Sequence, residues 1–400
     1  MRAIAWLLAA GVALTPLAAE AQSLDMLPES RYVKQGERFV PGGGGPIDLH
    51  FAIAREASGQ TDRFVNTSHA ALTLMSAWFG PPFTASLSIA GVFSLSGSLG
   101  WAAGANLVSV PAHWLSPARD QRLERELIDG IVREYWFRNR APTAFEYALV
   151  AYTGASATHQ LLAGSNFATL TFFGGFIPLP LRPVLLSPPI ADPRPRAWHF
   201  DSLTLASDNY ERDVRALQTI ERYVGWPTML EALARLRTAD RRDAESLANL
   251  LSDVRGTDMR SLVAECLRPD AVFDYAMDGL QSSPGSSGLV ETTVTITRHG
   301  SGRFALASGE ATMPVLIRFA NGSEVRDYFD GARPVARLIY SAPAAAISAT
   351  IDPDLMLLLD VNRENNSIRQ EQPVAPVGVR LALHWMAWLQ NAMLTYTALL

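Results

Sequence analysis

Hydrophobic and polar residues alternate with the period of a helix in several long stretches of the chain. Ala70, Leu74, Ala77 and Trp78 recur at helical spacing, and the helix that they predict ends at Gly80-Pro81-Pro82. The same spacing predicts further helices over 119–136 and 144–162, and a bundle of short helices within 208–268. A short apolar run at 107–110 is instead typical of a buried strand.

Beyond residue 288 the period of the pattern changes to two, which is typical of strands that bury one face. We therefore expect a small β-sandwich domain over 289–375. Asn321-Gly322 and Asp330-Gly331 lie between alternating runs, and both dipeptides are typical of hairpin turns. The preceding segment, 281–288, is rich in serine and glycine and is predicted to be a flexible linker.

These patterns together predict an α+β protein with two domains. The first is a mainly helical domain over 46–280, and the second is the β-sandwich. Residues 22–45 are polar and end in four consecutive glycines, so we expect them to form a flexible lead-in.

The first 21 residues have the features of a secretory signal peptide. Met1-Arg2 is a short basic start, Ala3–Ala19 is apolar and uncharged, and Ala19-Glu20-Ala21 supplies small residues where a signal peptidase cleaves. The alternative is an N-terminal membrane anchor, and Pro16 counts against it. We therefore expect an exported chain, located in the periplasm or elsewhere outside the cytoplasm.

Residues 377–400 are predicted to form a hydrophobic, amphipathic tail helix. The stretch 381–400 carries no formal charge, and Trp385, Trp388 and Tyr396 share one helical face. Such a helix is suited both to a membrane surface and to packing on the protein itself. Both alternatives stay open.

The composition favours a packed globular protein that does not bind nucleic acid. Of the 400 residues, 48% are hydrophobic and 18% are charged, and the formal net charge is -5. Phosphate binding needs clustered positive charge, which this balance does not supply. Lys34 is the single lysine, which argues against Schiff-base chemistry, and the single cysteine, Cys266, excludes an intramolecular disulfide.

Most motifs of catalytic chemistry are missing from the sequence. No two of the seven histidines lie three or four residues apart, so the chain has no H-E-x-x-H zinc motif. It also lacks the G-x-S-x-G motif of serine hydrolases and the glycine loops that hold phosphates. Asp352-Pro353-Asp354 with Asp360 would suit calcium, but such residues are more typical of turns around a strand.

Four short segments follow one another in an order that is known from one peptidase family: Trp78-Phe79-Gly80-Pro81-Pro82-Phe83, Tyr210-Glu211-Arg212, Gly256-Thr257-Asp258-Met259 and Ile351–Ser367. Together they resemble the alanyl-aminopeptidase family of gluzincin zinc metallopeptidases, over about residues 45–375. The resemblance implies a thermolysin-like, mainly helical peptidase-type domain, followed by a β-sandwich domain.

The zinc motif that this resemblance implies is degenerate in the chain. The family's H-E-x-x-H-Q motif aligns with residues 129–134, so Asp129 and Arg133 replace the two histidine ligands. Gly130 replaces the general-base glutamate, and Glu134 stands where the family has glutamine. An arginine at a ligand position would repel a zinc ion rather than bind it.

The other functional positions that the resemblance implies are also changed. The third zinc ligand aligns with Tyr147, and Glu146 lies one position away, so it would face another side of the helix. The glutamate that holds the substrate's free amine aligns with Ala103. Tyr210 matches the tyrosine that stabilises the oxyanion, but without a metal it is better explained as a structural tyrosine.

The degenerate site predicts a pseudo-peptidase with no metal or other cofactor. We expect an exported, aminopeptidase-like protein that binds a peptide or protein partner in the former active-site cleft, between the 119–136 helix and the Tyr210 helix. Residues 381–400 would add a membrane contact.

Two alternatives stay open at this point. The first is an active metallopeptidase that binds zinc through rearranged ligands, drawn from Asp129, Glu134, Glu146, His113 and His159. The second is a membrane-associated structural protein whose tryptophan-rich tail is its functional part.

Overall fold

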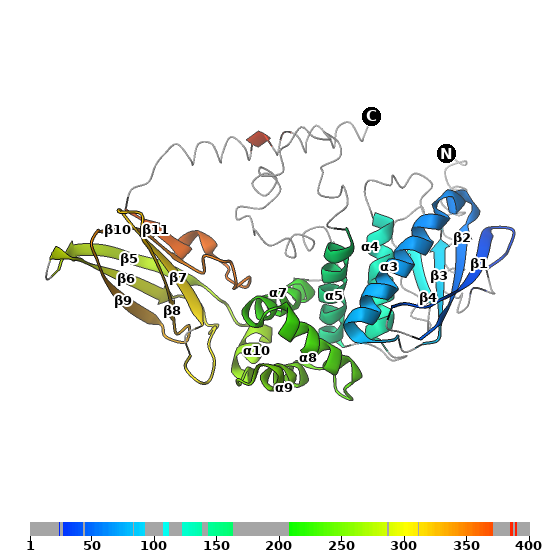
Figure 1. Ribbon diagram of the computed structural model, residues 1–400, viewed down its shortest axis with the longest axis horizontal. Coiled ribbons are helices and arrows are strands. Elements are labelled where there is room, and N and C mark those ends of the chain that lie inside the picture. The colour runs from blue at the N-terminus through cyan, green and yellow to red at the C-terminus, as the bar shows by residue number, and fades with distance from the viewer. Residues whose placement is uncertain are drawn as a thin grey trace, which may run out of the picture. The chain divides into compact units, whose positions relative to one another are not determined.

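The computed structural model combines helices and sheets, which confirms the α+β prediction (Figure 1). The chain divides into two compact units, residues 1–174 and 175–400, and each is described by itself. The structure describes residues 24, 27–42, 45–82, 84–92, 107–111, 122–137, 143–162, 208–285, 288–310, 312–370, 385, 386 and 389. The predicted signal peptide lies outside these residues.

The first unit contains a four-stranded sheet of order β1-β2-β3-β4. Its strands are β1 Tyr32–Phe39, β2 Ile47–Ala54, β3 Ser86–Val92 and β4 Leu107–Pro111. β1 and β2 are antiparallel, whereas β2, β3 and β4 are parallel to one another. β4 confirms the strand that was predicted at 107–110.

Strand β1 corrects the prediction of a flexible lead-in over 22–45. Its residues Tyr32–Phe39 pair in continuous register with Ile47–Ala54 of β2. The prediction was wrong because β1 is an edge strand with exposed polar residues at its centre, so it lacks the apolar alternation of a half-buried strand.

Helix α3, Thr61–Phe79, packs on one face of this sheet. The short 3-10 helix Arg55–Gln60 leads into α3. The helix ends at Gly80, because the φ of 75° at this residue lies outside the range of a right-handed helix. The Phe64 ring lies against Gly91 of β3, where an added β-carbon would be 2.8 Å from the ring. The missing side chain at Gly91 therefore lets the helix lie close to the sheet.

The described part of the first unit contains two further helices: α4 Arg122–Trp136 and α5 Ala144–Leu162. Both confirm predicted helices, α5 with the predicted bounds. Ser76 of α3 and Tyr135 of α4 share a buried hydrogen bond of 2.9 Å between their hydroxyls. The Trp136 indole nitrogen donates to Thr153 Oγ1 of α5 at 3.2 Å. These buried polar contacts fix how the three helices pack.

The described part of the second unit includes the predicted helical bundle. Its helices are α7 Asp208–Val224, α8 Trp226–Thr238, α9 Ala244–Arg255 and α10 Arg260–Leu267. Gly225 has a φ of 86° and Pro227 follows it in the first turn of α8, so the chain must turn sharply between α7 and α8.

The described strands of the second unit form a β-sandwich of two sheets (Figure 1). One sheet has the order β5-β6-β9: β5 Tyr275–Pro284, β6 Val290–Arg298 and β9 Val335–Ala342. The other has the order β11-β10-β7-β8: β7 Met313–Phe319, β8 Glu324–Phe329, β10 Ala346–Ile351 and β11 Ser367–Arg369. The 3-10 helix Arg363–Asn366 leads into β11. Val294 and Ile296 from one sheet and Ile317 from the other are at most 1% exposed, so both inner faces form the core.

Two expectations about this region were wrong. The segment 281–288 is not a linker, because residues 281–284 end β5 and pair with β6. Asp330-Gly331 does not form a hairpin, because β8 and β9 belong to different sheets. Composition indicates where the chain bends, but it does not show whether the next strand returns beside the last one. Asn321-Gly322 does connect the antiparallel pair β7 and β8, as predicted.

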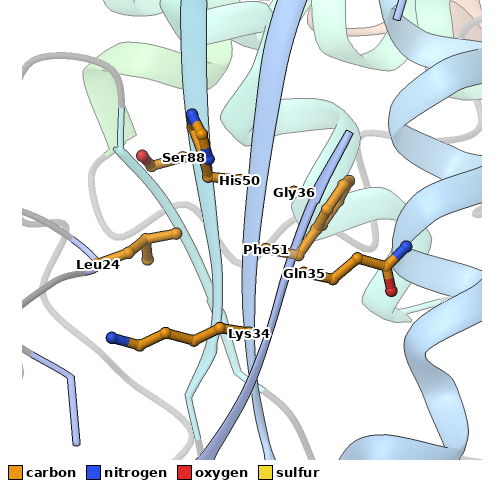
Figure 2. A pocket seen from close by; sticks show the side chains of 7 residues that line it. All are labelled: Leu24, Lys34, Gln35, Gly36, His50, Phe51 and Ser88. Atoms are coloured by element: carbon orange, nitrogen blue, oxygen red, sulfur yellow. The ribbon is translucent and has the colours of Figure 1, made fainter. Parts of the chain in front are cut away.

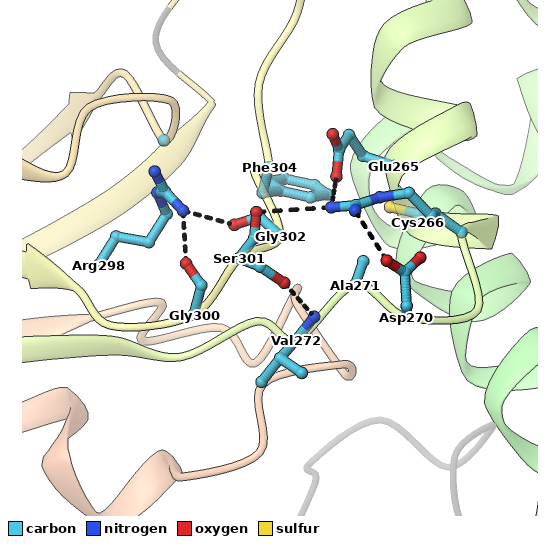
Figure 3. A network of polar contacts seen from close by, with 12 residues as sticks. Glu265, Cys266, Asp270, Ala271, Val272, Arg298, Gly300, Ser301, Gly302 and Phe304 are labelled. Carbon is cyan, nitrogen blue, oxygen red and sulfur yellow. Dashed lines mark hydrogen bonds and ion pairs between the residues drawn. The ribbon is translucent and has the colours of Figure 1, made fainter.

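The helical bundle and the sandwich of the second unit are joined by a polar seam (Figure 3). Arg268, just after α10, donates from its guanidinium to the Ser301 backbone oxygen at 3.5 Å. Its ion pairs with the neighbouring Glu265 at 2.9 Å and Asp270 at 3.3 Å hold the guanidinium in place. The Val272 backbone nitrogen donates to Ser301 Oγ at 3.2 Å, in the loop after β6. The predicted single domain over 46–280 is therefore divided, because its last helices share a unit with the sandwich.

The carboxyls of Asp352 and Asp360 accept backbone hydrogen bonds in the segment after β10. The two oxygens of the Asp352 carboxyl accept hydrogen bonds from the backbone nitrogens of Met356 at 2.7 Å and Leu357 at 2.8 Å. The Asp360 carboxyl accepts from the backbone nitrogen of Asn362 at 3.0 Å. Both carboxyls are thus used as turn acceptors, as the preferred interpretation of the sequence holds.

The predicted tail helix lies almost entirely outside the described residues. Trp385, Met386 and Leu389 are helical and are 61%, 57% and 55% exposed. Within the described ranges, no helix combines the length and the apolar character needed to cross a membrane. The attachment of 381–400 to a membrane stays a prediction.

Candidate functional site

The aligned zinc-motif residues lie on α4, at its contact with α5. Asp129 is directed at Gly154 of α5, and a β-carbon added to Gly154 would be 2.3 Å from Asp129 Oδ1. Only glycine leaves room for the carboxyl at this distance. The Asp129 carboxyl therefore fills the space between the two helices beside Gly154.

The surroundings of Asp129 favour its protonated form. Burial, the largest cause, raises the pKa of the Asp129 carboxyl to about 7. The positive charge of Arg133 opposes this rise, and the negative charge of Glu126 adds to it. Near neutral pH the carboxyl is therefore only partly ionised, and a protonated carboxyl is a poor ligand for zinc.

The other residues of the degenerate motif also lie on α4. Gly130 is buried, while Arg133 and Glu134 are half-buried. Arg133 places its charge near Asp129, as the effect on the Asp129 pKa shows. A guanidinium so close to the aligned ligand positions works against a cation, because like charges repel.

Glu146 caps the first turn of α5. Its Oε2 accepts a hydrogen bond of 3.0 Å from the Thr143 backbone nitrogen, and its own backbone nitrogen donates to Thr143 Oγ1 at 3.2 Å. This reciprocal pair is a capping box. The side chain is 1% exposed and turned back toward the helix start, so it acts as a structural residue.

Tyr147, which aligns with the third zinc ligand, is on the surface. It is 40% exposed, and its ring meets the Phe137 ring edge to face at 5.5 Å between centroids. The one-residue offset from Glu146 thus separates a buried capping residue from an exposed aromatic residue, as the helical period requires.

The structure does not place several other predicted site residues beside Asp129 and Glu146. Ala103 and His113 lie outside the described residues, and so does the side chain of Tyr210, whose backbone belongs to α7. His159 is half-buried near the end of α5. Across the described ranges, no group of three His, Cys, Asp or Glu side chains could hold a metal ion.

Arg212, from the Tyr210-Glu211-Arg212 segment, has a structural role in the second unit. Its guanidinium donates to the backbone oxygens of Cys266 and Ala271, each at 3.1 Å. The two acceptors lie at the end of α10 and in the segment that leads to β5. The residue therefore anchors α7 to the entry of the sandwich, a role that the motif does not reveal.

Sequence reasoning missed Gly154 and Thr143, the residues that determine what Asp129 and Glu146 do. Thr143 with Glu146 three residues later is a capping-box signature just before an apolar run, so this pair could have been found. Gly154 carries no such signal, because its importance comes from a contact with another helix.

Known proteins resemble this chain in their structure, and no similarity in sequence was found. No protein-family model and no curated protein sequence matches the chain. Among solved structures, the chain is similar to aminopeptidase A of Legionella pneumophila in complex with aspartic acid, with a TM-score of 0.53 and 13% identity. The match covers 82% of this chain. The fold is peptidase-like.

The same match covers 38% of the Legionella chain, so this chain spans well under half the length of that enzyme. At 13% identity the likeness shows the fold alone. Membership of the alanyl-aminopeptidase family is therefore part of the proposal that follows.

Proposed function

We propose that this protein is a non-catalytic relative of the gluzincin alanyl-aminopeptidases that binds a peptide or protein partner. The observation that carries the proposal is the contact between Asp129 and Gly154. At the position that the resemblance aligns with a zinc ligand, a carboxyl that is only partly ionised near neutral pH fills the space between two helices. The proposal further holds that the chain is exported by residues 1–21 and that residues 381–400 contact a membrane.

The chemistry of the aligned positions supports a protein without zinc hydrolysis. A hydrolytic zinc needs three protein ligands and one open position for its water. On α4 and α5 the aligned positions hold Asp129 packed on Gly154, the cation Arg133 and the exposed Tyr147. Peptide binding does not need the metal, since burial and backbone pairing are enough.

The test is the zinc content of the purified full chain after exposure to zinc and dialysis, measured by elemental analysis. We expect far less than one zinc per chain and no hydrolysis of aminoacyl-arylamides. In parallel, immobilised full chain is exposed to a library of short peptides. Retention of a defined peptide class by the zinc-free chain is the expected second result.

One tightly bound zinc per chain, or zinc-dependent hydrolysis, would overturn the proposal in favour of rearranged ligands. Alanine variants of Asp129, Glu134 and His159 would then show which side chain holds the metal. Failure to retain any peptide or protein, with the fold intact by circular dichroism, would refute the binding role.

A further inference from the structure

A cavity of about 330 Å³ lies on the sheet of the first unit (Figure 2). Its lining comes from β1, β2, β3 and the segment before β1: Leu24, Lys34, Gln35, Gly36, His50, Phe51 and Ser88. Its size lies at the small end of the range of about 300–1,000 Å³ that is usual for small-molecule sites. None of these residues belongs to α4 or α5, so the cavity is separate from the degenerate zinc motif.

The strand register brings three polar side chains to the same face of the sheet. His50 of β2 pairs with Gly36 of β1 on one side and with Ser88 of β3 on the other. Lys34 lies two residues before Gly36, so it shares the face and stands diagonally opposite His50. Figure 2 shows Lys34, His50 and Ser88 on one side, while Gln35 and Phe51 point away from them.

This face is turned away from α3. Gly91 of β3 lies under Phe64 of α3, and Ser88 is an odd number of residues from Gly91, so it belongs to the opposite face. Part of that opposite face is covered by Leu24, which packs with Ala52 and Ala90. The cavity thus has an apolar wall beside its polar side chains.

Gly36 keeps the space above the His50 ring open. A β-carbon at Gly36 would lie 3.5 Å from His50 Nδ1, in van der Waals contact. Any longer side chain would therefore extend into the cavity. The glycine is in ordinary extended backbone within β1, so a larger residue is sterically allowed by the backbone itself.

The charges around the cavity suit a single negative charge. Lys34, the one lysine among 34 basic residues, is exposed. Arg38 and Asp48 lie one step further along the same face, and they form an ion pair with 4.0 Å between Nε and Oδ1. Within the described residues, the side chains of Lys34, His50 and Ser88 form no hydrogen bond or ion pair with one another or with neighbours. Their donors are therefore available to a ligand.

We propose that this cavity binds a small organic carboxylate with a short apolar tail. The carboxylate accepts a hydrogen bond from the Lys34 ammonium, and the Ser88 hydroxyl and the His50 ring line another part of the cavity. The tail packs against Leu24. The single ammonium of Lys34 balances the charge of a monoanion better than that of a phosphate dianion. Inorganic phosphate has no apolar part, so it would make no contact with the apolar wall of the cavity.

The test is titration of the full chain with hexanoate, followed by NMR or calorimetry, beside hexylamine and inorganic phosphate. Hexanoate should bind with a Kd on the order of 1 mM, and hexylamine, which carries the same tail and the opposite charge, should not bind. Phosphate that binds more tightly than hexanoate would overturn the carboxylate class. Absence of hexanoate binding would overturn the site.

Variants separate this cavity from general surface charge. Lys34→Gln should weaken hexanoate binding about tenfold or more, and Gly36→Leu should abolish it by filling the cavity without changing the charge. Arg38→Gln removes a cation from the same face and should leave the Kd within about twofold. Equal losses in Lys34→Gln and Arg38→Gln, or unchanged binding in a folded Gly36→Leu variant, would refute the assignment. Neither result depends on the zinc content or the peptide binding of the chain.

Discussion

At the scale of single residues, the contact of Asp129 with Gly154 couples three properties of the first unit. The absent side chain of Gly154 lets α4 and α5 approach, and their approach buries the Asp129 carboxyl. Burial in turn raises the pKa of that carboxyl to about 7. The close packing of the helices, the burial of the Asp129 carboxyl and its raised pKa therefore have one cause, and substitutions at either residue should change them together.

Gly154→Ala should destabilise the chain by about 1–3 kcal/mol, because the new β-carbon collides with the Asp129 carboxyl. In an Asp129→Ala background the same change should instead stabilise by about 1 kcal/mol, since alanine is the better helix former. Urea unfolding of the four chains measures both effects. Gly59→Ala is the control, because a β-carbon there meets nothing within 4 Å. The same sign of change in both backgrounds would contradict the contact.

Asp129→Asn should stabilise the protein at alkaline but not at acidic pH. The folded pKa of about 7 exceeds the unfolded value near 3.9, so the unfolded state ionises first as the pH rises. The cost to folding is absent below about pH 4, grows up to about pH 7 and then stays constant. Asparagine removes this cost, so the gain should be near zero at pH 4 and about 2–4 kcal/mol at pH 8.

Unfolding free energies at several pH values measure the gain, with Asp240→Asn as the control because Asp240 is exposed in a loop. The control should show no pH-dependent gain. A gain for Asp129→Asn that is equal at pH 4 and pH 8 would show that the carboxyl ionises with an ordinary pKa.

At the scale of elements, the start of α5 shows how a carboxylate near a degenerate site can be structural. Glu146 and Thr143 satisfy each other's backbone nitrogens, which have no partner within the helix itself. The buried carboxylate is therefore explained without a metal, and its role predicts which substitutions the site tolerates.

Glu146→Gln should preserve the stability of the chain to within about 0.5 kcal/mol, because glutamine also completes a capping box. Glu146→Ala should cost about 1–2 kcal/mol, since the Thr143 backbone nitrogen loses its acceptor. Thermal unfolding distinguishes the two variants. Equal loss in both, together with loss of bound zinc, would show instead that the carboxylate is a ligand.

The sequence predicted the elements that have a strong period, and failed where geometry beyond the local chain decides. Helix α7 lies within the predicted bundle because Val214, Leu217 and Ile220 recur at helical spacing and form its buried face. Strand β1 was missed because an exposed edge strand needs only backbone pairing, and Asp330-Gly331 was misread because a turn does not reveal which strand comes beside it. The motif positions come from the resemblance and stay a prediction, whereas Gly154 and the Lys34 cavity depend on contacts between distant segments.

At the scale of the whole molecule, the helices and the sandwich of the second unit share buried contacts at several points. Thr219 Oγ1 of α7 accepts a hydrogen bond of 3.1 Å from the Leu358 backbone nitrogen. The Tyr223 ring of α7 meets the Phe304 ring edge to face at 5.5 Å. Leu358 belongs to the turn that the Asp352 carboxyl organises, so the bundle and the sandwich should unfold as one cooperative body.

Asp352→Ala should therefore weaken α7 and β10 together. The variant leaves the backbone nitrogens of Met356 and Leu357 without acceptors in a buried turn, and it places alanine at a φ of 49°, so we expect a loss of about 2–4 kcal/mol. Native-state hydrogen exchange should show equal losses of protection in Asp208–Val224 and in Ala346–Ile351. Asp354→Ala, two residues away and paired at the surface with Arg326, should cost less than about 0.5 kcal/mol. If Asp352→Ala lowered protection in β10 but left α7 unchanged, the helices would fold independently of the sandwich, and the seam would join two separate domains.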